Sequence, residues 1–179
     1  KQRLGFPRCT GRFWIVTKEG CGAMRLLFQQ RLFSWFDSYD VYDQEGNTVY
    51  TVKGQLSWGH RLQIYDARGQ HLGTVQERGI SLLPKFDLYL GDWLAGTLKK
   101  ELTFLRPRFT LNCNGWVIQG DLWQWSYQVT EGGRTVMSLS KELWNWSDTY
   151  QMDIPRPGDA LLCLMIVLAI DAGKCSRGG

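Results

Sequence analysis

The feature that most restricts the fold is a stretch near the C-terminus, residues 160–170, in which every side chain is apolar. Pro157 is suited to a first helical turn and Asp159 places a negative charge near a helix start, so a helix is predicted here, with Asp171 and Gly173 as its stop. A helix that is apolar on every side must be surrounded on every side. In a chain made otherwise of strands, we expect the sheet to surround it.

This stretch is too short to cross a membrane. A helix of this length spans about 17 Å, whereas the hydrocarbon core of a bilayer is roughly 30 Å thick. The sequence therefore predicts a buried central helix and no transmembrane span. A membrane anchor and a solitary buried strand are the alternatives.

A repeat of about 23 residues runs through the preceding part of the chain. The segment 42–46 returns as 65–69, each with an Asp followed by a Gly three positions later, and looser copies occupy 89–98 and 131–139. Such an Asp bonds to the backbone of its own turn and the Gly adopts the left-handed residue of a type I turn with a bulge. The repeated unit is predicted to be a β-hairpin.

The number of short alternating segments predicts the architecture. Roughly twelve lie between residues 26 and 154, and the segment 84–88 itself returns as 107–111. Nine Trp, eight Phe, seven Tyr and 20 Gly are typical of strands and tight turns. Because a long open sheet exposes two edges, we predict a mostly β fold, an antiparallel barrel of about twelve strands closed around the C-terminal helix.

The charge and the ends of the chain suggest one domain with appendages. The net charge of +4 arises within residues 1–23, and the rest of the chain is balanced, which argues against nucleic-acid binding. We expect residues 1–23 to be an extension ahead of a natural start at Met24, with a functional basic arm as the alternative. The barrel domain is predicted to span 24–173, and 174–179 to form a tail.

The five cysteines form no CxxC pair, and their odd number is typical of reduced thiols in a cytoplasmic protein. Cys163 lies within the apolar stretch, where it is expected to be a small buried hydrophobe.

In the order of its segments, the chain resembles the LURP-one-related family over essentially residues 24–172. The matching segments are 24–35, 39–43 with Gly46, 53–54, 99–101, 159–162 and 168–171. Members of this family have the Tubby C-terminal-like fold that is also assigned to phospholipid scramblases. The resemblance implies a twelve-stranded barrel around a hydrophobic C-terminal helix, in agreement with the argument from the residues.

The resemblance also implies functions that involve lipids. Tubby-like domains are associated with phosphoinositide binding, and scramblases with lipid movement and a calcium-responsive acidic segment ahead of the last helix. Cations near strand ends are candidate ligands for an anionic lipid head group: Lys53, Lys99, Lys100, Arg106, Arg108 and Lys141. The alternative is that each is a solvated partner of a neighbouring carboxylate, such as Glu101 beside Lys100.

Calcium binding is a weaker hypothesis. Asp148 and Asp153 stand where the scramblase acidic segment would lie, but two carboxylates in an alternating pattern are typical of an ordinary strand. A second acidic group lacks the spacing of a calcium loop and is better explained by turns: Asp37, Asp40, Asp43 and Glu45. No metal and no cofactor is predicted.

Aromatic side chains offer one further candidate surface. Trp123, Trp125 and Tyr127 are expected to share one face of a strand, as are Trp144 and Trp146 of another. Such ladders stack ligands or lie at membrane interfaces, although packing in the core is their commoner use.

No catalytic motif is present. His60 and His71 stand in no recognisable triad or zinc pattern, and the sequence contains no GxSxG, HExxH or phosphate-binding glycine loop. We therefore predict a non-enzymatic, cytoplasmic module that associates peripherally with anionic phospholipids or phosphoinositides. The alternative is an intracellular scaffold or regulatory domain that binds other proteins and has no affinity for lipids.

Overall fold

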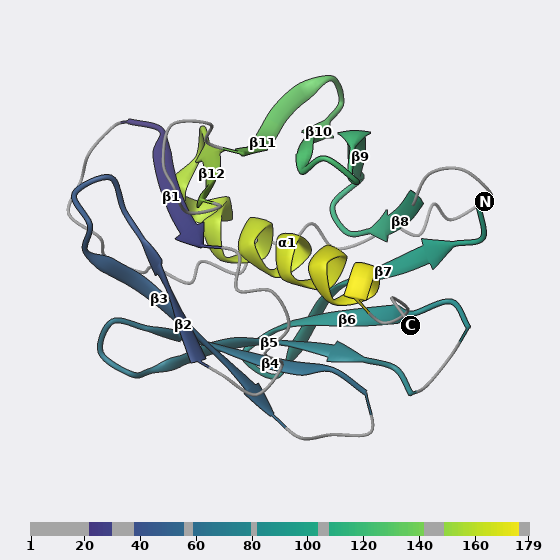
Figure 1. Cartoon of the computed structure of the whole chain (residues 1–179), viewed down its shortest axis with the longest axis horizontal. Helices are drawn as coiled ribbons and strands as arrows, with labels where there is room; N and C mark the ends of the chain where they lie inside the picture. Colours follow the sequence, from purple (N-terminus) through teal and green to yellow (C-terminus); the bar gives the residue numbers. More distant parts are fainter. Residues whose placement is uncertain are drawn as a thin grey trace, which may run out of the picture.

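The computed structural model describes residues 22–29, 38–55, 59–79, 82–103, 108–141 and 149–175 of the chain (Figure 1). Twelve β-strands precede one α-helix in these residues. The strands are β1 (Met24–Gln29), β2 (Ser38–Tyr42), β3 (Thr48–Gln55), β4 (Arg61–Asp66), β5 (His71–Glu77), β6 (Lys85–Leu90), β7 (Trp93–Glu101), β8 (Arg108–Asn112), β9 (Trp116–Asp121), β10 (Ser126–Glu131), β11 (Arg134–Lys141) and β12 (Thr149–Ile154).

All twelve strands belong to a single antiparallel sheet that curls into a nearly closed barrel. Its order is β8-β7-β6-β5-β4-β3-β2-β1-β12-β11-β10-β9, so the first strand pairs with the last. The predicted fold class is confirmed. In the described residues no ladder joins β8 to β9, although these strands are consecutive and linked by a tight turn, in which Trp116 N donates to Cys113 O at 2.8 Å.

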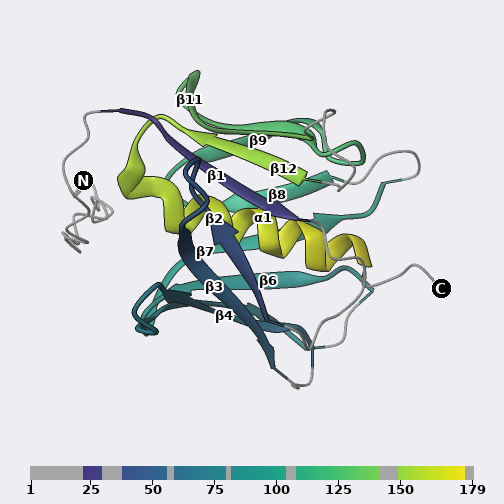
Figure 2. The ribbon, with the colours of Figure 1, turned by 60° about the vertical axis from the view of Figure 1, so that its left-hand side comes forward.

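The α-helix, α1 (Ala160–Cys175), runs through the middle of the barrel with strands on all sides (Figure 2). Residues 162–170 are all buried, and Cys163, Met165 and Ile166 have no exposed surface. The strands contribute alternate residues to this core; in β12, Tyr150, Met152 and Ile154 face inward. The prediction of a buried central helix, with Cys163 as a small core residue, is confirmed. No helix among the described residues has the length and apolarity needed to span a membrane.

The start of the helix agrees with the sequence, but its end does not. A 3₁₀ turn, Pro157–Asp159, leads into α1 as expected from the proline. The predicted stop at Asp171 and Gly173 is wrong, because the helix continues to Cys175. Gly173 serves packing instead: a Cβ atom there would lie 2.8 Å from Cε1 of Phe109.

The 23-residue repeat corresponds to hairpins, as predicted. The four copies are the hairpins β2–β3, β4–β5, β6–β7 and β10–β11, and each ladder contains a shift in register. In the second copy, Asp66 Oδ1 accepts hydrogen bonds from the backbone N–H groups of Arg68 and Gln70, at 2.9 and 2.8 Å, while Gly69 has a φ of 79°. The repeat in the sequence therefore corresponds to the tight turns at one end of the barrel.

We predict that shortening a buried side chain of α1 destabilises the whole barrel, because the helix and the strands contribute to one common core. Ile166→Ala should lower the free energy of unfolding by about 2 to 5 kcal/mol. Val117→Ala on β9, where the side chain is 52% exposed, should cost less than about 1 kcal/mol. Urea unfolding followed by circular dichroism measures both free energies. Equal losses of stability in the two variants would contradict the central role of the helix in the core.

Candidate functional site

The antiparallel topology sorts the connections between strands into two groups, one at each end of the barrel. Connections after the odd-numbered strands lie at one end, and those after the even-numbered strands lie at the other. The helix begins after β12, and its Gly173 carbonyl accepts a hydrogen bond from Lys100 near the end of β7. α1 therefore ends among the connections that follow odd-numbered strands. We define the helix-end rim as the connections at this end together with the three strand residues on either side of each connection. The helix-start rim is the corresponding region at the opposite end.

The structure places the described candidate cations at the helix-end rim. They are Lys53 on β3, Lys99 and Lys100 on β7, Arg108 on β8 and Lys141 on β11. Arg106 lies outside the described residues. Lys53 stacks on the ring of Tyr65, with its Nζ 4.7 Å from the ring centroid. The strands of Lys53 and Lys141 are not neighbours of β7 and β8, so these two lysines stand elsewhere on the rim.

Two adjacent candidates, Lys99 and Lys100, point to opposite sides of the barrel wall. Leu98 is fully buried in the core, so alternation turns Lys99 outward and Lys100 inward. Lys100 Nζ donates to the Gly173 carbonyl oxygen at 2.8 Å, near the negative end of the helix dipole. Lys100 therefore binds the end of α1, whereas Lys99 is exposed on the outer surface.

The outer surface near Lys99 carries further cations. Lys85 on β6 lies directly opposite Lys99 in the ladder, and Arg108 on β8 lies diagonally across from Lys99. We call these three residues the basic patch; no ion pair within the described part of the chain includes any of them. Like charges that face each other across strands, such as Lys85 and Lys99, are unfavourable, whereas Arg108 lies directly opposite Glu101 in the β7–β8 ladder.

Sequence reasoning did not select Lys85 as a site residue, although the repeat contained the signal. The segments 84–88 and 107–111 are copies of each other, and they place Lys85 and Arg108 at equivalent positions at the start of β6 and β8. Arg108 was selected and its counterpart was not.

The two rims differ in charge. Basic residues prevail on the strands and connections of the helix-end rim, where the described ones are Lys53, Arg61, Arg78, Lys85, Lys99, Lys100, Arg108 and Lys141, against Asp40, Glu77, Asp87, Glu101 and Asp121. Acidic residues prevail at the helix-start rim, with Asp43, Glu45, Asp66, Asp92, Glu131, Asp153 and Asp159 against Arg25, Arg68, Arg134 and Arg156. The described barrel therefore has a positive and a negative end.

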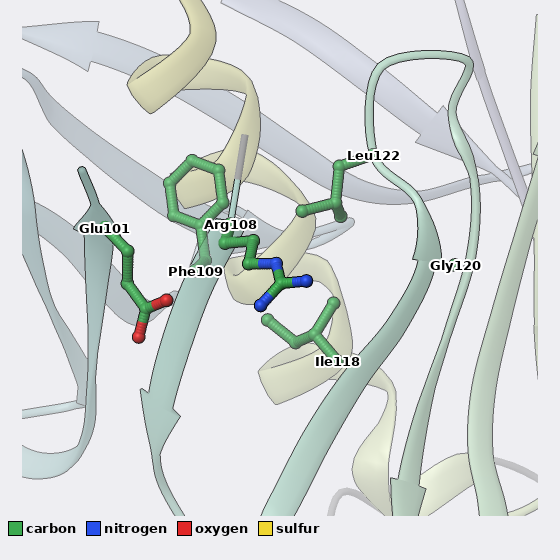
Figure 3. Close-up of a pocket in the computed structure, with 6 residues that line it drawn as sticks. All are labelled: Glu101, Arg108, Phe109, Ile118, Gly120 and Leu122. Carbon is green, nitrogen blue, oxygen red and sulfur yellow. The ribbon is translucent and has the colours of Figure 1, made fainter. Parts of the chain in front are cut away.

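A pocket of about 320 Å³ lies at the seam between β8 and β9 (Figure 3). It is lined by Glu101, Arg108, Phe109, Ile118, Gly120 and Leu122. The guanidinium of Arg108 is directed across the gap toward Ile118 of β9, while the Glu101 carboxylate lies on the other side of the β8 ribbon in this view. Glu101 accepts a hydrogen bond from the hydroxyl of Thr110. The pocket at the seam is thus lined by apolar side chains and by Arg108 of the basic patch.

Ionisable groups also line the inside of the barrel at the helix-end rim. Burial raises the pKa of Asp171 to about 6, against the opposing effect of the Lys174 and His60 charges. Burial, followed by the charge of Asp171, raises the pKa of Tyr39 and Tyr127.

The same region contains a cation–π contact and a histidine–carboxylate pair. Lys174 Nζ lies 3.5 Å from the centroid of the Trp125 ring. His60 Nδ1 lies 2.5 Å from Oε2 of the buried Glu77.

The aspartates that were considered for calcium and that the structure describes take part in other contacts; Asp37 lies outside the described residues. Asp153 accepts a hydrogen bond from Arg25 at 2.6 Å within the β1–β12 pair, so it acts as a strand residue, and Asp148 lies outside the described residues. Asp43 bonds to Asn47 in its turn, and Asp40 accepts from Thr51 at 2.6 Å. Among the described residues, no group of His, Cys, Asp and Glu is arranged to hold a metal ion.

The expected aromatic ladder on one strand is wrong. Trp123 and Trp125 lie in the turn between β9 and β10, where Trp125 adopts a φ of 56°. Trp125 and Tyr127 are buried in the core, whereas Trp123 is 70% exposed. The turn interrupts strand alternation and separates these side chains; Trp144 and Trp146 lie outside the described residues.

Neither histidine forms a catalytic arrangement in the described part of the chain. His60 pairs with Glu77, and His71 Nε2 lies 3.0 Å from the hydroxyl of Thr74. Nothing among the described side chains points to catalysis.

Fold and site define a mostly β protein, an antiparallel barrel around a single C-terminal helix with a basic end. The family model described as LURP-one-related matches residues 24–171. The chain belongs to the LURP-one-related family, and the resemblance stated from the sequence is confirmed.

One relative is similar in sequence, and one solved structure is similar in fold. The chain is 32% identical to the uncharacterised protein YxjI of Bacillus subtilis over 149 residues, which cover 83% of this chain and 92% of YxjI. The fold is similar to the X-ray structure of an Arabidopsis thaliana protein, with a TM-score of 0.57, 14% identity, and coverage of 84% of this chain and 91% of the other. At this identity the second likeness shows the fold alone.

We predict that the two adjacent lysines of β7 differ in their effect on stability. Lys100→Met removes a charge-assisted hydrogen bond to the end of α1 and should lower the free energy of unfolding by about 1 to 3 kcal/mol. Lys99→Met, one residue away on the outer surface, should change it by less than about 0.5 kcal/mol. Chemical denaturation of both variants tests the assignment, and equal losses would show that Lys100 does not hold the helix.

We also predict that Asp171 makes stability depend on pH. Its folded pKa of about 6 lies above the ordinary value near 4, so the native state holds this proton after the unfolded chain has released it. The free energy of unfolding should therefore fall as pH rises from about 4 to 6, by about 2 kcal/mol from this group.

Asp171→Asn is neutral at every pH and serves as the control for that prediction. Between pH 4.5 and 7, the variant should gain about 2 kcal/mol of stability relative to the parent protein. Urea unfolding at both pH values measures this, and a constant difference between variant and parent would show that Asp171 does not titrate in this interval.

Proposed function

We propose that this protein is a non-enzymatic module that associates peripherally with membranes containing anionic phospholipids. The helix-end rim is the surface that meets the membrane, at its cytoplasmic side. Phosphoinositides and phosphatidylserine are the lipid class that this surface recognises.

The observation that carries the proposal is the basic patch. Lys85 and Lys99 face each other across β6 and β7 with no carboxylate partner among the described residues, and Arg108 stands diagonally across from Lys99. Repulsion between neighbouring cations is relieved when a phosphate lies between them. An anionic head group therefore gains from this site both a charge interaction and hydrogen bonds.

The charge distribution supports the same orientation. A barrel with a basic and an acidic end turns its basic end toward a negatively charged surface. Each Lys or Arg near such a surface contributes about 1 kcal/mol, which decays within a Debye length. Lys53 and Lys141 add to this general attraction from other parts of the rim, whereas Lys100 belongs to the support of α1.

We predict that loss of two charges from the basic patch weakens membrane binding. Lys85→Gln with Lys99→Gln should reduce the affinity for vesicles of phosphatidylcholine and phosphatidylserine about tenfold or more at low salt. Binding of the parent protein should itself weaken as salt increases, because the attraction is screened. Co-sedimentation with vesicles over a range of salt concentrations measures both effects.

The matched control removes two cations from the opposite end. Arg68→Gln with Arg134→Gln changes the net charge equally but lies at the helix-start rim, and should leave vesicle binding within about twofold of the parent. If the parent protein does not bind anionic vesicles, or if both double variants bind equally, the proposal is wrong. Recovery of a stoichiometric protein partner without lipid would then favour a scaffold function.

A further inference from the structure

The connections at the helix-end rim expose apolar side chains as well as cations. Leu82 lies between β5 and β6, Leu102 follows β7, and Trp123 lies in the turn between β9 and β10. Their exposed fractions are 79%, 79% and 70%, the highest among the large exposed hydrophobic residues of the described chain. We call these three residues the apolar tips.

The remaining exposed hydrophobic residues occupy a different kind of position. Tyr42, Trp93, Leu94 and Val117 belong to strands near the helix-start rim, and their exposed fractions range from 37% to 54%. Side chains of strands are part of the barrel wall and partly covered by their neighbours. The apolar tips instead project from connections, beyond the ends of the strands.

Two of the apolar tips lie in connections that border the basic patch, and the third lies in the turn next to the seam pocket. Leu82 stands three residues before Lys85, and Leu102 three residues after Lys99. Trp123 follows Leu122, which lines the seam pocket beside Arg108 (Figure 3). Leucine and tryptophan side chains exposed to water near cations do not stabilise a folded protein. The combination matches the interface of an anionic bilayer, where aromatic and apolar groups insert and cations contact phosphates.

We infer that Leu82, Leu102 and Trp123 insert into the interfacial region of an anionic bilayer while the basic patch contacts its head groups. This inference rests on the proposed function, and it adds how deeply the protein enters the bilayer and which end of the barrel faces it. The end of α1 faces the membrane, and the helix-start rim with its surplus of carboxylates faces away from it. Binding then has a charge component that salt weakens and an apolar component that salt does not.

A pair of double variants separates the two components. Leu102→Ser with Trp123→Ser removes two apolar tips, and Leu94→Ser with Trp93→Ser removes one leucine and one tryptophan from the strand β7 near the opposite rim. Thermal unfolding followed by circular dichroism establishes that both are folded. Co-sedimentation uses vesicles of phosphatidylcholine and phosphatidylserine at low and at high salt.

The parent protein is expected to bind at low salt and to retain measurable binding at high salt. The tip variant is expected to bind at least tenfold more weakly and to lose the salt-resistant fraction, whereas the β7 control stays within about twofold of the parent. If the parent does not bind even at low salt, the proposed function fails and insertion fails with it. If the parent binds but the tip variant binds as well as the parent does, insertion is wrong while the head-group proposal stands. The same conclusion follows if the β7 control loses as much binding as the tip variant.

A fluorescence measurement provides a second readout that tolerates some loss of stability in the variants. Vesicles with brominated acyl chains should quench part of the tryptophan emission of the parent protein. Trp123→Phe is expected to abolish that part, and Trp93→Phe to leave it unchanged. Quenching that survives in Trp123→Phe would show that this tip does not enter the bilayer.

Discussion

The structure depends on the exclusion of water from one helix that has no polar face. Residues 162–170 are buried around the whole circumference of α1, and only a sheet that curls back on itself can supply that many apolar contacts from a chain of short hairpins. The pairing of β1 with β12 brings together the two ends of the barrel's chain just before the helix starts. The same arrangement leaves the seam between β8 and β9, which are the two outer strands of the sheet.

Because the walls of the barrel face the helix on one side and solvent on the other, neighbouring residues take unrelated roles. Lys100 stabilises the end of α1 through the Gly173 carbonyl, and Lys99 belongs to the outer basic patch. Gly173 keeps a small volume against Phe109, the residue next to Arg108 in β8. The same two strands, β7 and β8, therefore contact the end of the helix on one side and carry outer cations on the other.

The proposed function follows from the difference between the two ends. Short hairpin turns occupy the helix-start rim, where acidic residues prevail, whereas the helix-end rim has longer connections with cations and exposed apolar side chains. A membrane surface discriminates between two such ends through charge and through apolar insertion, which act independently. No catalytic geometry in the described residues competes with this interpretation.

The sequence alone determined the architecture, because its signals are local or periodic. The apolar stretch at 160–170 had to be enclosed by the rest of the chain. The repeated spacing of an Asp and a Gly, as in Asp66 and Gly69, predicted hairpins, and the number of short strands predicted a barrel. It also placed the candidate cations near strand ends. Only the tertiary structure decided which cations meet and added Lys85 to them: the pairing of Lys85 with Lys99 depends on the register of β6 and β7, and the hydrogen bond of Lys100 depends on where α1 ends. Gly173 lies within the helix instead of ending it and packs closely on Phe109 of β8, a contact distant in sequence. The turn before β10 likewise exposes Trp123 and buries Trp125, whose ring packs against Tyr150 of β12.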